Sequence, residues 1–421
     1  MDNLAALDLG PAGSLLRDNK SQNSVIRKIK RLNVALKNTN QERSISSWTI
    51  ESIRAAIEAQ VSGDFSRTSV LARSMLTDSA FSAALDSRVA GVTRSEFSLI
   101  PLDDTAVDRT VAEAIESIWF SVLDELTLSR FIKQYHLIGV ALAFADWTHR
   151  DRESDIILPR ITLLDTEFLS YDTVTSELKY TTDDGSVTVT PGDGNWIMMS
   201  KWDIGEVVGA VSHLGVDWIN KQLALADWSS GNETHQSPMV AVSESGTGLV
   251  VSSDEEDIDS LISELQVAAR EKFIYLPPGK SISTIDTNSQ YKPEAFRELI
   301  EFVDRKYTVS ILGGNLSSEV ASTGANRAAA EVHNGVKKQL IQSDVEVLSS
   351  VIRDQLVRNI VEANFGSSVS IPWPSWSTSS REDPAQLISA LTTISQLTAS
   401  THRIKNIIEI ASRLGIELEQ L

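Results

Sequence analysis

The spacing of apolar residues predicts helices in the first third of the chain. From Ser47 to Val92, and again over Thr105 to Leu126 and Leu128 to Val140, apolar side chains recur every three or four positions. A short strand is expected over Phe97 to Pro101, and an apolar segment, Ala141 to Trp147, follows the third helical stretch.

Beyond residue 150 the apolar period falls to two, which is the period of half-buried strands. Asp-Gly and Gly-Asp turns divide this region into short segments. The expected strands are Ile157 to Leu164, Phe168 to Asp172, Lys179 to Thr182, Ser186 to Thr190 and Asn195 to Ser200. Helices followed by a small sheet predict an α+β protein.

Two further helices bracket a compact insertion. The first is expected over Gly205 to Trp228, and the second from Lys292 and Pro293 to about Leu312. The insertion is predicted to hold a strand or loop over Ser237 to Val251 and a helix that Ser253 caps and that runs to Lys272. Two strands, 273–276 and 281–285, are expected to flank a Pro-Pro-Gly turn.

A flexible loop and a very long helix come next. Residues 313–325 are rich in Gly, Ser and Thr and contain one charged side chain, Glu319, so this loop interacts weakly. From Ala325 to Asn364 the pattern predicts one uninterrupted helix, about 60 Å long at about 1.5 Å per residue. Two runs with steps of four form its apolar seam: Val332, Val336, Leu340, and then Leu348, Ile352, Leu356, Ile360. Such a length favours an extended or oligomeric structure.

The two ends of the chain carry separate segments. Residues 1–45 form a basic arm, either a solvated or partner-docked tail or a clamp on acidic surfaces or DNA phosphates. After the long helix we expect a strand over Val369 to Trp373, a Pro-Trp-Pro-Ser-Trp turn, and short helices over Asp383 to Leu397 and Arg403 to Leu414.

Composition narrows the class of protein. The 421 residues are 42% apolar and 23% charged, as in globular proteins, and the net charge of -19 argues against a surface that coats nucleic acid. It still permits DNA to pass through an acidic channel. The absence of cysteine excludes disulfides, thiolate metal sites and cysteine nucleophiles. No apolar stretch reaches the roughly 18 residues that span a bilayer, and the N-terminus has no signal-peptide core, so we expect a soluble intracellular protein without a membrane partner.

Motifs for chemistry are absent from the sequence. The histidines are scattered without metal-ligand spacing, no P-loop lysine follows Gly313-Gly314, and no GxSxG or paired-carboxylate motif occurs. We therefore expect no catalytic residue, no metal and no cofactor, and we expect the nine tryptophans to pack in cores rather than stack on bases. An acidic run lacks the spacing of an EF-hand, and forms either the solvated first turn of a helix or a docking surface. Its members are Asp254, Glu255, Glu256 and Asp257.

Three segments around the loop resemble one family. They are Ile311-Leu312-Gly313, Asn326-Arg327-Ala328 with Ala330-Glu331-Val332-His333, and the long helix with Asp344 and Leu348. These are similar to phage portal proteins, most closely the Mu-like portal family. Met75 to Val92, followed by Phe97 to Pro101, gives a second match, and with the order of elements the resemblance covers about residues 70–365. The chain departs from the family at Gly314, Asn315 and Ser317, where glutamine and threonines are usual.

The resemblance implies a portal-type fold in which each segment has a place. Residues 46–204 would form the wing, 205–228 and 292–312 the two stem helices, and 229–291 an α/β clip. Residues 313–325 would form the tunnel loop, 326–366 the long helix from channel to wing, and 367–421 a wing strand and a short helical crown. Twelve copies would form a ring at a capsid vertex of the virion, after assembly in the host cytoplasm. Double-stranded DNA would be packaged and ejected through it, and its partners would be the large terminase subunit, a neck or adaptor protein and the major capsid protein.

The resemblance also implies three groups of site residues. The tunnel loop would line the DNA channel with Gly313, Gly314, Asn315, Leu316, Ser317, Ser318, Glu319, Ser322 and Thr323. The clip would dock the motor through Asp254, Glu255, Glu256 and Asp257. Subunit packing would involve Arg327, Glu331, His333, Lys337 and Lys338, the two lysines either in pairs between subunits or in modest salt bridges.

Two alternatives from other classes stay open on the sequence. An oligomeric helical scaffold or adaptor protein without a DNA channel explains the long seam equally well. An enzyme with an unrecognised site is the second. A closed ring with an open pore separates a portal from a filamentous or dimeric scaffold.

Overall fold

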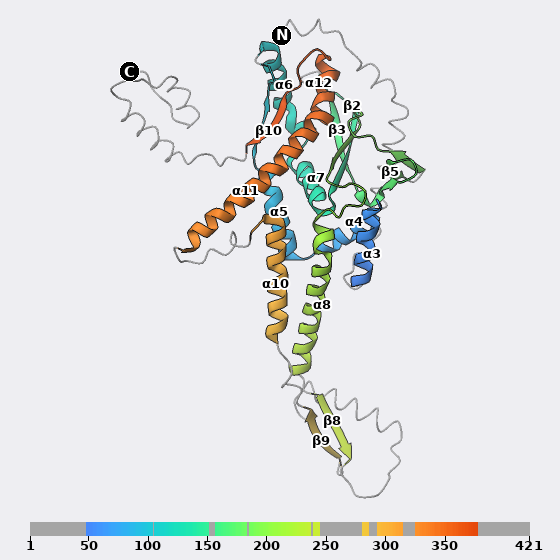
Figure 1. Ribbon diagram of the computed structural model, residues 1–421, viewed down its shortest axis with the longest axis vertical. Helices are drawn as coiled ribbons and strands as arrows, with labels where there is room; N and C mark the ends of the chain where they lie inside the picture. Colours follow the sequence, from blue (N-terminus) through green and yellow to red (C-terminus); the bar gives the residue numbers. More distant parts are fainter. Residues whose placement is uncertain are drawn as a thin grey trace, which may run out of the picture.

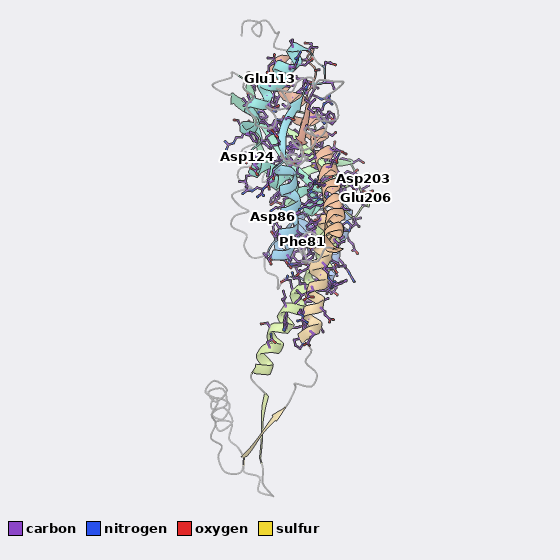
Figure 2. All side chains as sticks on the ribbon, turned by 90° about the vertical axis from the view of Figure 1, so that its left-hand side faces the viewer. Phe81, Asp86, Glu113, Asp124, Asp203 and Glu206 are labelled. Atoms are coloured by element: carbon purple, nitrogen blue, oxygen red, sulfur yellow. The ribbon has the colours of Figure 1, made fainter. Side chains whose placement is uncertain are left out.

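The computed structural model describes residues 48–103, 105–150, 156–182, 185–236, 239–244, 280–285, 293–314 and 325–377. The molecule is elongated, with a body of helices and small sheets (Figure 1). Helices α8 (Ala210–Gln236) and α10 (Pro293–Leu312) project from this body side by side, and a two-stranded ribbon lies beyond their far ends. Figure 2 shows the same elongation from a second direction.

Helices of the body form where the sequence predicts them. They are α3 (Ile50–Val61), α4 (Ser66–Met75), α5 (Ser79–Thr93), α6 (Ala106–Val122) and α7 (Glu125–Ile138). The Asp78 carboxylate caps α5 by accepting from the N–H groups of Ala80 and Phe81. Asp124 caps α7 in the same way, and Gly139, with φ of 87°, ends it in the left-handed conformation.

All four sheets in the described residues are antiparallel. The strands are β1 (Glu96–Ile100), β2 (Val140–Arg150), β3 (Ile157–Leu164), β4 (Leu169–Asp172), β5 (Glu177–Thr182), β6 (Gly185–Thr188), β7 (Trp196–Ser200), β8 (Met239–Glu244), β9 (Lys280–Ile285) and β10 (Trp373–Ser377). Their orders are β1-β10, β3-β2-β7, β4-β5-β6 and β8-β9. The apolar segment after α7 becomes β2, the central strand of its sheet, and its residues 140–145 are all buried.

The long helix is continuous in direction but changes its hydrogen-bond pattern once. It consists of α11 (Ala325–Ile352), a π-helical turn (Arg353–Val357) and α12 (Arg358–Phe365), whereas the sequence predicted one regular helix. The second half of the predicted seam is confirmed, because Leu348, Ile352, Leu356 and Ile360 are at most 1% exposed. This half of the helix closes the core of the body against the sheet and α5.

Two amide side chains from this helix occupy both edges of the β3-β2-β7 sheet. Gln355, in the π-helical turn, accepts from the N–H of Met198 at 2.7 Å and donates to its carbonyl at 3.1 Å. Asn364 does the same with the N–H and carbonyl of Ile157, at 2.7 and 3.0 Å. One residue on each edge strand is thus paired by a side-chain amide in place of a neighbouring strand.

Both expected bounds of α8 were wrong. Helix α8 begins at Ala210 rather than Gly205, because the segment ahead of it presses against the end of α7. A Cβ on Gly209, whose φ is 86°, would lie 2.5 Å from the carbonyl oxygen of Leu137. The helix also continues to Gln236, beyond Trp228. Strand β9 pairs with β8, and its expected partner, 273–276, lies outside the described residues.

The last strand was placed too early in the sequence. The predicted Val369 to Trp373 is followed by the real strand, Trp373–Ser377, which includes the expected turn. Aromatic packing selects this register: Trp376 lies opposite Phe97 on β1, and Phe97 stacks on Trp119 with ring centres 4.3 Å apart. Pro374 is tolerated because the ribbon has only two strands. The basic arm, the helix after Ser253 and the C-terminal helices lie outside the described residues.

Candidate functional site

Helix α10 ends where α5, α10 and α11 meet, immediately before the predicted loop in the sequence. Gly313 follows its last residue with φ of 77°, and its N–H donates to the carbonyl of Val309 at 2.9 Å. A Cβ on Gly313 would lie 2.7 Å from Cγ1 of Val336 and 2.9 Å from Cδ1 of Leu340. Glycine is therefore required here by both the backbone conformation and the close approach of α11.

An arginine from α5 fixes this junction. Arg88 donates through Nη1 to the carbonyl of Ile311 at 2.7 Å, which satisfies a terminal carbonyl of α10. Its Nε and Nη2 donate to the two carboxylate oxygens of Asp344 on α11, at 2.8 and 3.1 Å. Because Arg88 and Asp344 are only 12% and 6% exposed, this forked pair holds α5, α10 and α11 in one arrangement.

Three more titratable groups surround the Asp344 carboxylate. His136 of α7 places Nε2 3.1 Å from Oδ2 of Asp344, without the alignment of a hydrogen bond. Lys201 lies with its ammonium 4.5 Å from the ring centre of Tyr135. Burial alone would raise the pKa of Asp344, but the neighbouring His136 and Arg88 lower it to about 2. Burial lowers the pKa of His136 and of Lys201, and raises the pKa of Tyr135 to about 12.

A second buried ion cluster anchors the projecting helices to the body. Lys221 of α8 donates to Asp78, the cap of α5, at 2.8 Å and to Asp304 of α10 at 2.6 Å. Tyr307 of α10 packs edge-on against Phe81 of α5, with ring centres 5.3 Å apart. The root of the helix pair is therefore held by both charge and packing, close to the labelled Phe81 in Figure 2.

Only part of the predicted site lies in the described residues. Gly313 and Gly314 form the start of the loop, and Gly314 is buried. Lys337 donates to the hydroxyl of Ser87 in the same chain at 2.8 Å, and Lys338 is exposed. Arg327, Glu331 and His333 belong to α11, but their side chains lie outside what the structure describes. So do the remaining loop residues and the acidic run: Asn315, Leu316, Ser317, Ser318, Glu319, Ser322, Thr323, Asp254, Glu255, Glu256 and Asp257.

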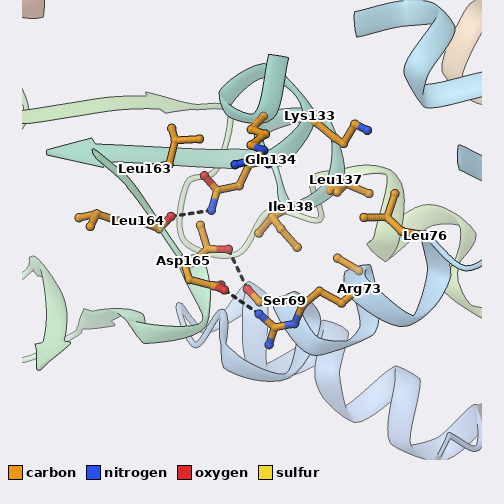
Figure 3. Close-up of a pocket in the computed structure, with 13 residues that line it drawn as sticks. Ser69, Arg73, Leu76, Lys133, Gln134, Leu137, Ile138, Leu163, Leu164 and Asp165 are labelled. Atoms are coloured by element: carbon orange, nitrogen blue, oxygen red, sulfur yellow. Dashed lines mark hydrogen bonds and ion pairs between the residues drawn. The ribbon is translucent and has the colours of Figure 1, made fainter. Parts of the chain in front are cut away.

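A pocket of about 700 Å³ opens between α4, α7 and the end of β3 (Figure 3). Some of its polar groups bind one another: Arg73 pairs with Asp165 at 2.6 Å, and Gln134 donates to the carbonyl of Leu164 at 2.8 Å. Its lining residues come from α4, α7 and the end of β3, so the pocket lies where these elements meet. Among the described residues no cluster of ligands suits a metal ion, and no helix there is long and apolar enough to cross a membrane.

Comparison with known protein families shows to which family the chain belongs. The model of a family described as the portal protein of Mu bacteriophage matches residues 69–410, most of the chain. The chain belongs to this portal family. The resemblance seen around the loop and the long helix is thereby confirmed. Portal proteins are structural, and the role of the chain is that of a phage head–tail connector.

Two of three similar solved structures share the fold of this chain, at low sequence identity. A chain in the virion of a native gene transfer agent particle is 14% identical, with a TM-score of 0.52 over 87% of this chain and 99% of that one. A chain in the neck of the native particle, computed with C12 symmetry, is 12% identical, with a TM-score of 0.51 over 88% and 99%. An HK97 family phage portal protein from Corynebacterium diphtheriae gives 12% and 0.43 over 75% and 96%. No curated protein matches the sequence.

Sequence reasoning missed the titratable residues that lie at the junctions between helices of this portal fold. Arg88, His136, Lys201 and Lys221 each stand within or beside otherwise apolar stretches, which is the available signal. Such a charge is almost never buried unless it is paired. Its partner cannot be named from the sequence, because Arg88 and Asp344 are 256 positions apart.

Proposed function

We propose that twelve copies of this portal chain form a ring at a capsid vertex, and that double-stranded DNA passes through its channel during packaging and ejection. One observation carries the proposal: in a chain of the portal family, helix α10, which packs alongside α8, ends at the Gly313 junction, where the loop begins between α10 and α11. The C12 symmetry of a neck that shares the fold supports the number of copies.

The proposed parts follow the order of elements. Residues 46–204 form the wing, 205–228 and 292–312 the two stem helices, 229–291 the clip, 313–325 the tunnel loop, 326–366 the long helix, and 367–421 the last wing strand and the crown. The ribbon of β8 and β9, beyond the far ends of the stem, supports the clip assignment. Docking of the large terminase subunit and of a neck or adaptor protein is proposed there, with Asp254, Glu255, Glu256 and Asp257 as the acidic contact. The major capsid protein would surround the wing in the virion, after assembly in the host cytoplasm.

The composition of the proposed tunnel loop suits a sliding contact. Each Lys or Arg that neutralises a phosphate adds affinity for DNA and thus resistance to movement. Residues 313–325 contain no Lys or Arg, and Glu319 is their one charged side chain. The loop therefore touches DNA through Gly, Ser and Thr, which adapt to a helix whose symmetry differs from that of the ring.

Cryo-electron microscopy of the purified protein tests the ring. We expect a closed ring of twelve copies with a pore wide enough for duplex DNA; a closed dimer or a pore-free filament would favour the scaffold alternative. The loop is tested by packaging assays on Ser317→Lys/Ser318→Lys, with Ser317→Gln/Ser318→Gln as the uncharged control. We expect slower packaging in the lysine variant alone, and equal rates in both would contradict the role of the loop.

A further inference from the structure

The ribbon of β1 and β10 has one buried face and one face on which large apolar side chains remain exposed. On the buried face, Leu99 and Trp376 are at most 5% exposed. Side chains alternate between the two faces along a strand, so the residues next to these point outwards. On that outer face Ile100 and Trp373 lie opposite each other in register, and they are 52% and 39% exposed.

This outer face has the character of a docking surface. Leu102, just beyond the end of β1, adds a 60% exposed side chain. The guanidinium of Arg353, from the π-helical turn, lies 5.0 Å from the ring centre of Trp373 and holds one side of that ring in place. Ser98 and Ser375, the next pair along the outer face, are small and half-buried, so a helix can approach the ribbon closely. An ordered aromatic ring within an exposed apolar patch is typical of an interaction surface.

The chain that follows the ribbon carries a matching apolar surface. In the helix predicted over Asp383 to Leu397, three apolar residues, Leu387, Leu391 and Ile394, recur at i, i+4 and i+7 on one side. Isolated helices of this length are marginal in water, so the apolar side needs another surface to cover it. The opposite side is polar without charge and consists of Ser389, Thr392, Thr393 and Gln396.

The connection between ribbon and predicted helix is long enough for the helix to fold back. Residues 378–382 follow Ser377, the last residue of β10, and span at most about 17 Å at about 3.3–3.6 Å per residue. Trp373 lies about 13 Å back along the strand at about 3.3 Å per residue. A helix that reverses direction and rises about 1.5 Å per residue brings Ile394 about 16 Å back from Asp383, which is level with Trp373.

We propose that the helix over residues 383–397 packs its apolar side on the outer face of the ribbon in the same chain, over Ile100, Leu102 and Trp373. The contact adds a third element to a two-stranded ribbon, which gains stability from such packing. It also fixes the start of the C-terminal region beside the long helix, because Arg353 of that helix contacts Trp373. The contact lies within one chain, so it does not depend on the ring proposed above.

Disulfide trapping in the full-length protein tests the contact directly, because the chain has no cysteine of its own. Under mild oxidation, Ile100→Cys combined with Leu391→Cys or with Ile394→Cys should form a disulfide within one chain, since the Cα atoms of a disulfide lie within about 7 Å of each other. Peptide mass spectrometry of the monomer band identifies it. Ile100→Cys/Gln396→Cys, with the second cysteine on the polar side of the helix, is the matched control and should stay reduced. Disulfide-linked dimers would mean that a second copy covers the patch. That result, or disulfides in neither test pair or equally in the control, would overturn the proposal.

Hydrogen exchange tests the same contact without cysteines. Ile100→Ser/Leu102→Ser removes two side chains that are more than half exposed, so the body should stay folded and exchange in β2 should not change. We expect amide exchange in residues 383–397 to become at least tenfold faster. Phe120→Ser/Leu126→Ser, which removes two side chains that are 68% and 59% exposed on α6 and α7, is the control and should leave that exchange unchanged. Unchanged exchange in the first variant, or equal acceleration in both, would refute the docking of this helix on the ribbon.

Discussion

The side-chain amide of Gln355 pairs with the backbone of Met198 as a neighbouring strand would, accepting from its N–H at 2.7 Å and donating to its carbonyl at 3.1 Å. Gln355 lies in the π-helical turn, and Met198 lies on an edge strand of the central sheet. A π turn lets one side of the long helix shift in register, and π turns recur where a helix meets a special requirement. Here the requirement is a fixed attachment between helix and sheet.

Replacing Gln355 with Leu should destabilise the fold. The N–H and carbonyl of Met198 would lose both partners in a half-buried position, so we expect a loss of about 2 kcal/mol in the free energy of unfolding. Urea denaturation measures it. Gln342→Leu, at an exposed position on the same helix, is the control and should change the free energy by less than about 0.5 kcal/mol. Equal effects of the two substitutions would mean that the Met198 contact contributes nothing.

Substitution of Gly313, at the loop junction, should destabilise the protein more than substitution of Gly205, which has a similar backbone conformation but no neighbouring atoms. Gly313 and Gly205 have φ of 77° and 87°, but only Gly313 has atoms within 4 Å of an added Cβ. Gly205→Ala should cost about 1 kcal/mol from backbone strain alone. We expect Gly313→Ala to cost clearly more, because Val336 and Leu340 must move as well. Thermal denaturation of the two variants provides the comparison, and equal losses would contradict the close approach of α11.

The ion pairs of Lys221 and Lys306 should contribute very differently to the free energy of unfolding. Lys221 is 7% exposed between Asp78 and Asp304, so Lys221→Met leaves two carboxylates without their cation and should cost about 3–5 kcal/mol. Lys306 is 45% exposed beside Asp217, and Lys306→Met should cost at most about 1 kcal/mol. Both variants are measured by denaturant titration at neutral pH. A similar cost for both would show that burial at the root of the stem does not matter.

Acid should weaken the cluster around Asp344. Burial lowers the pKa of His136 below its usual 6.5, so as pH falls below that value the unfolded chain binds a proton more readily than the folded chain, and stability declines. Asp344 has a pKa of about 2 instead of 3.8, so its contribution is present above pH 3.8 and is lost as pH falls towards 2. Arg88, Lys201 and Tyr135 face the same cluster.

Denaturation at several pH values tests this. The free energy of unfolding should fall from pH 7 to pH 5, and His136→Gln should flatten that part of the profile while leaving the decline at lower pH. A variant profile parallel to the wild type would exclude His136 as the source.

Local pattern predicted most of the elements, and long-range contacts account for the rest. Helix α10 has its predicted end because a proline start and a glycine stop are written into the sequence at Pro293 and Gly313. Strand β10 was misplaced because its register depends on Phe97 and Trp119, which are distant in sequence. Nothing in the local sequence indicates the π turn, because glutamine is a good α-helix former. The turn is explained only by the contact of Gln355 with Met198, which is distant in sequence. Helix α10 ends at Leu312 and α11 begins at Ala325, on either side of the predicted loop, whereas Arg88 and Asp344 meet only in the folded chain.

The seam of the long helix has a consequence for the order of folding during synthesis. Leu348, Ile352, Leu356 and Ile360 complete a core whose other members precede residue 220 for the most part, and β10 pairs with β1. The N-terminal half of the body leaves the ribosome well before this helix. The apolar residues of that half therefore stay exposed in the nascent chain until the helix has been synthesised. Contacts so distant in sequence also form slowly. Only nearly complete chains can present a finished body, and partly made chains are therefore kept out of assembly.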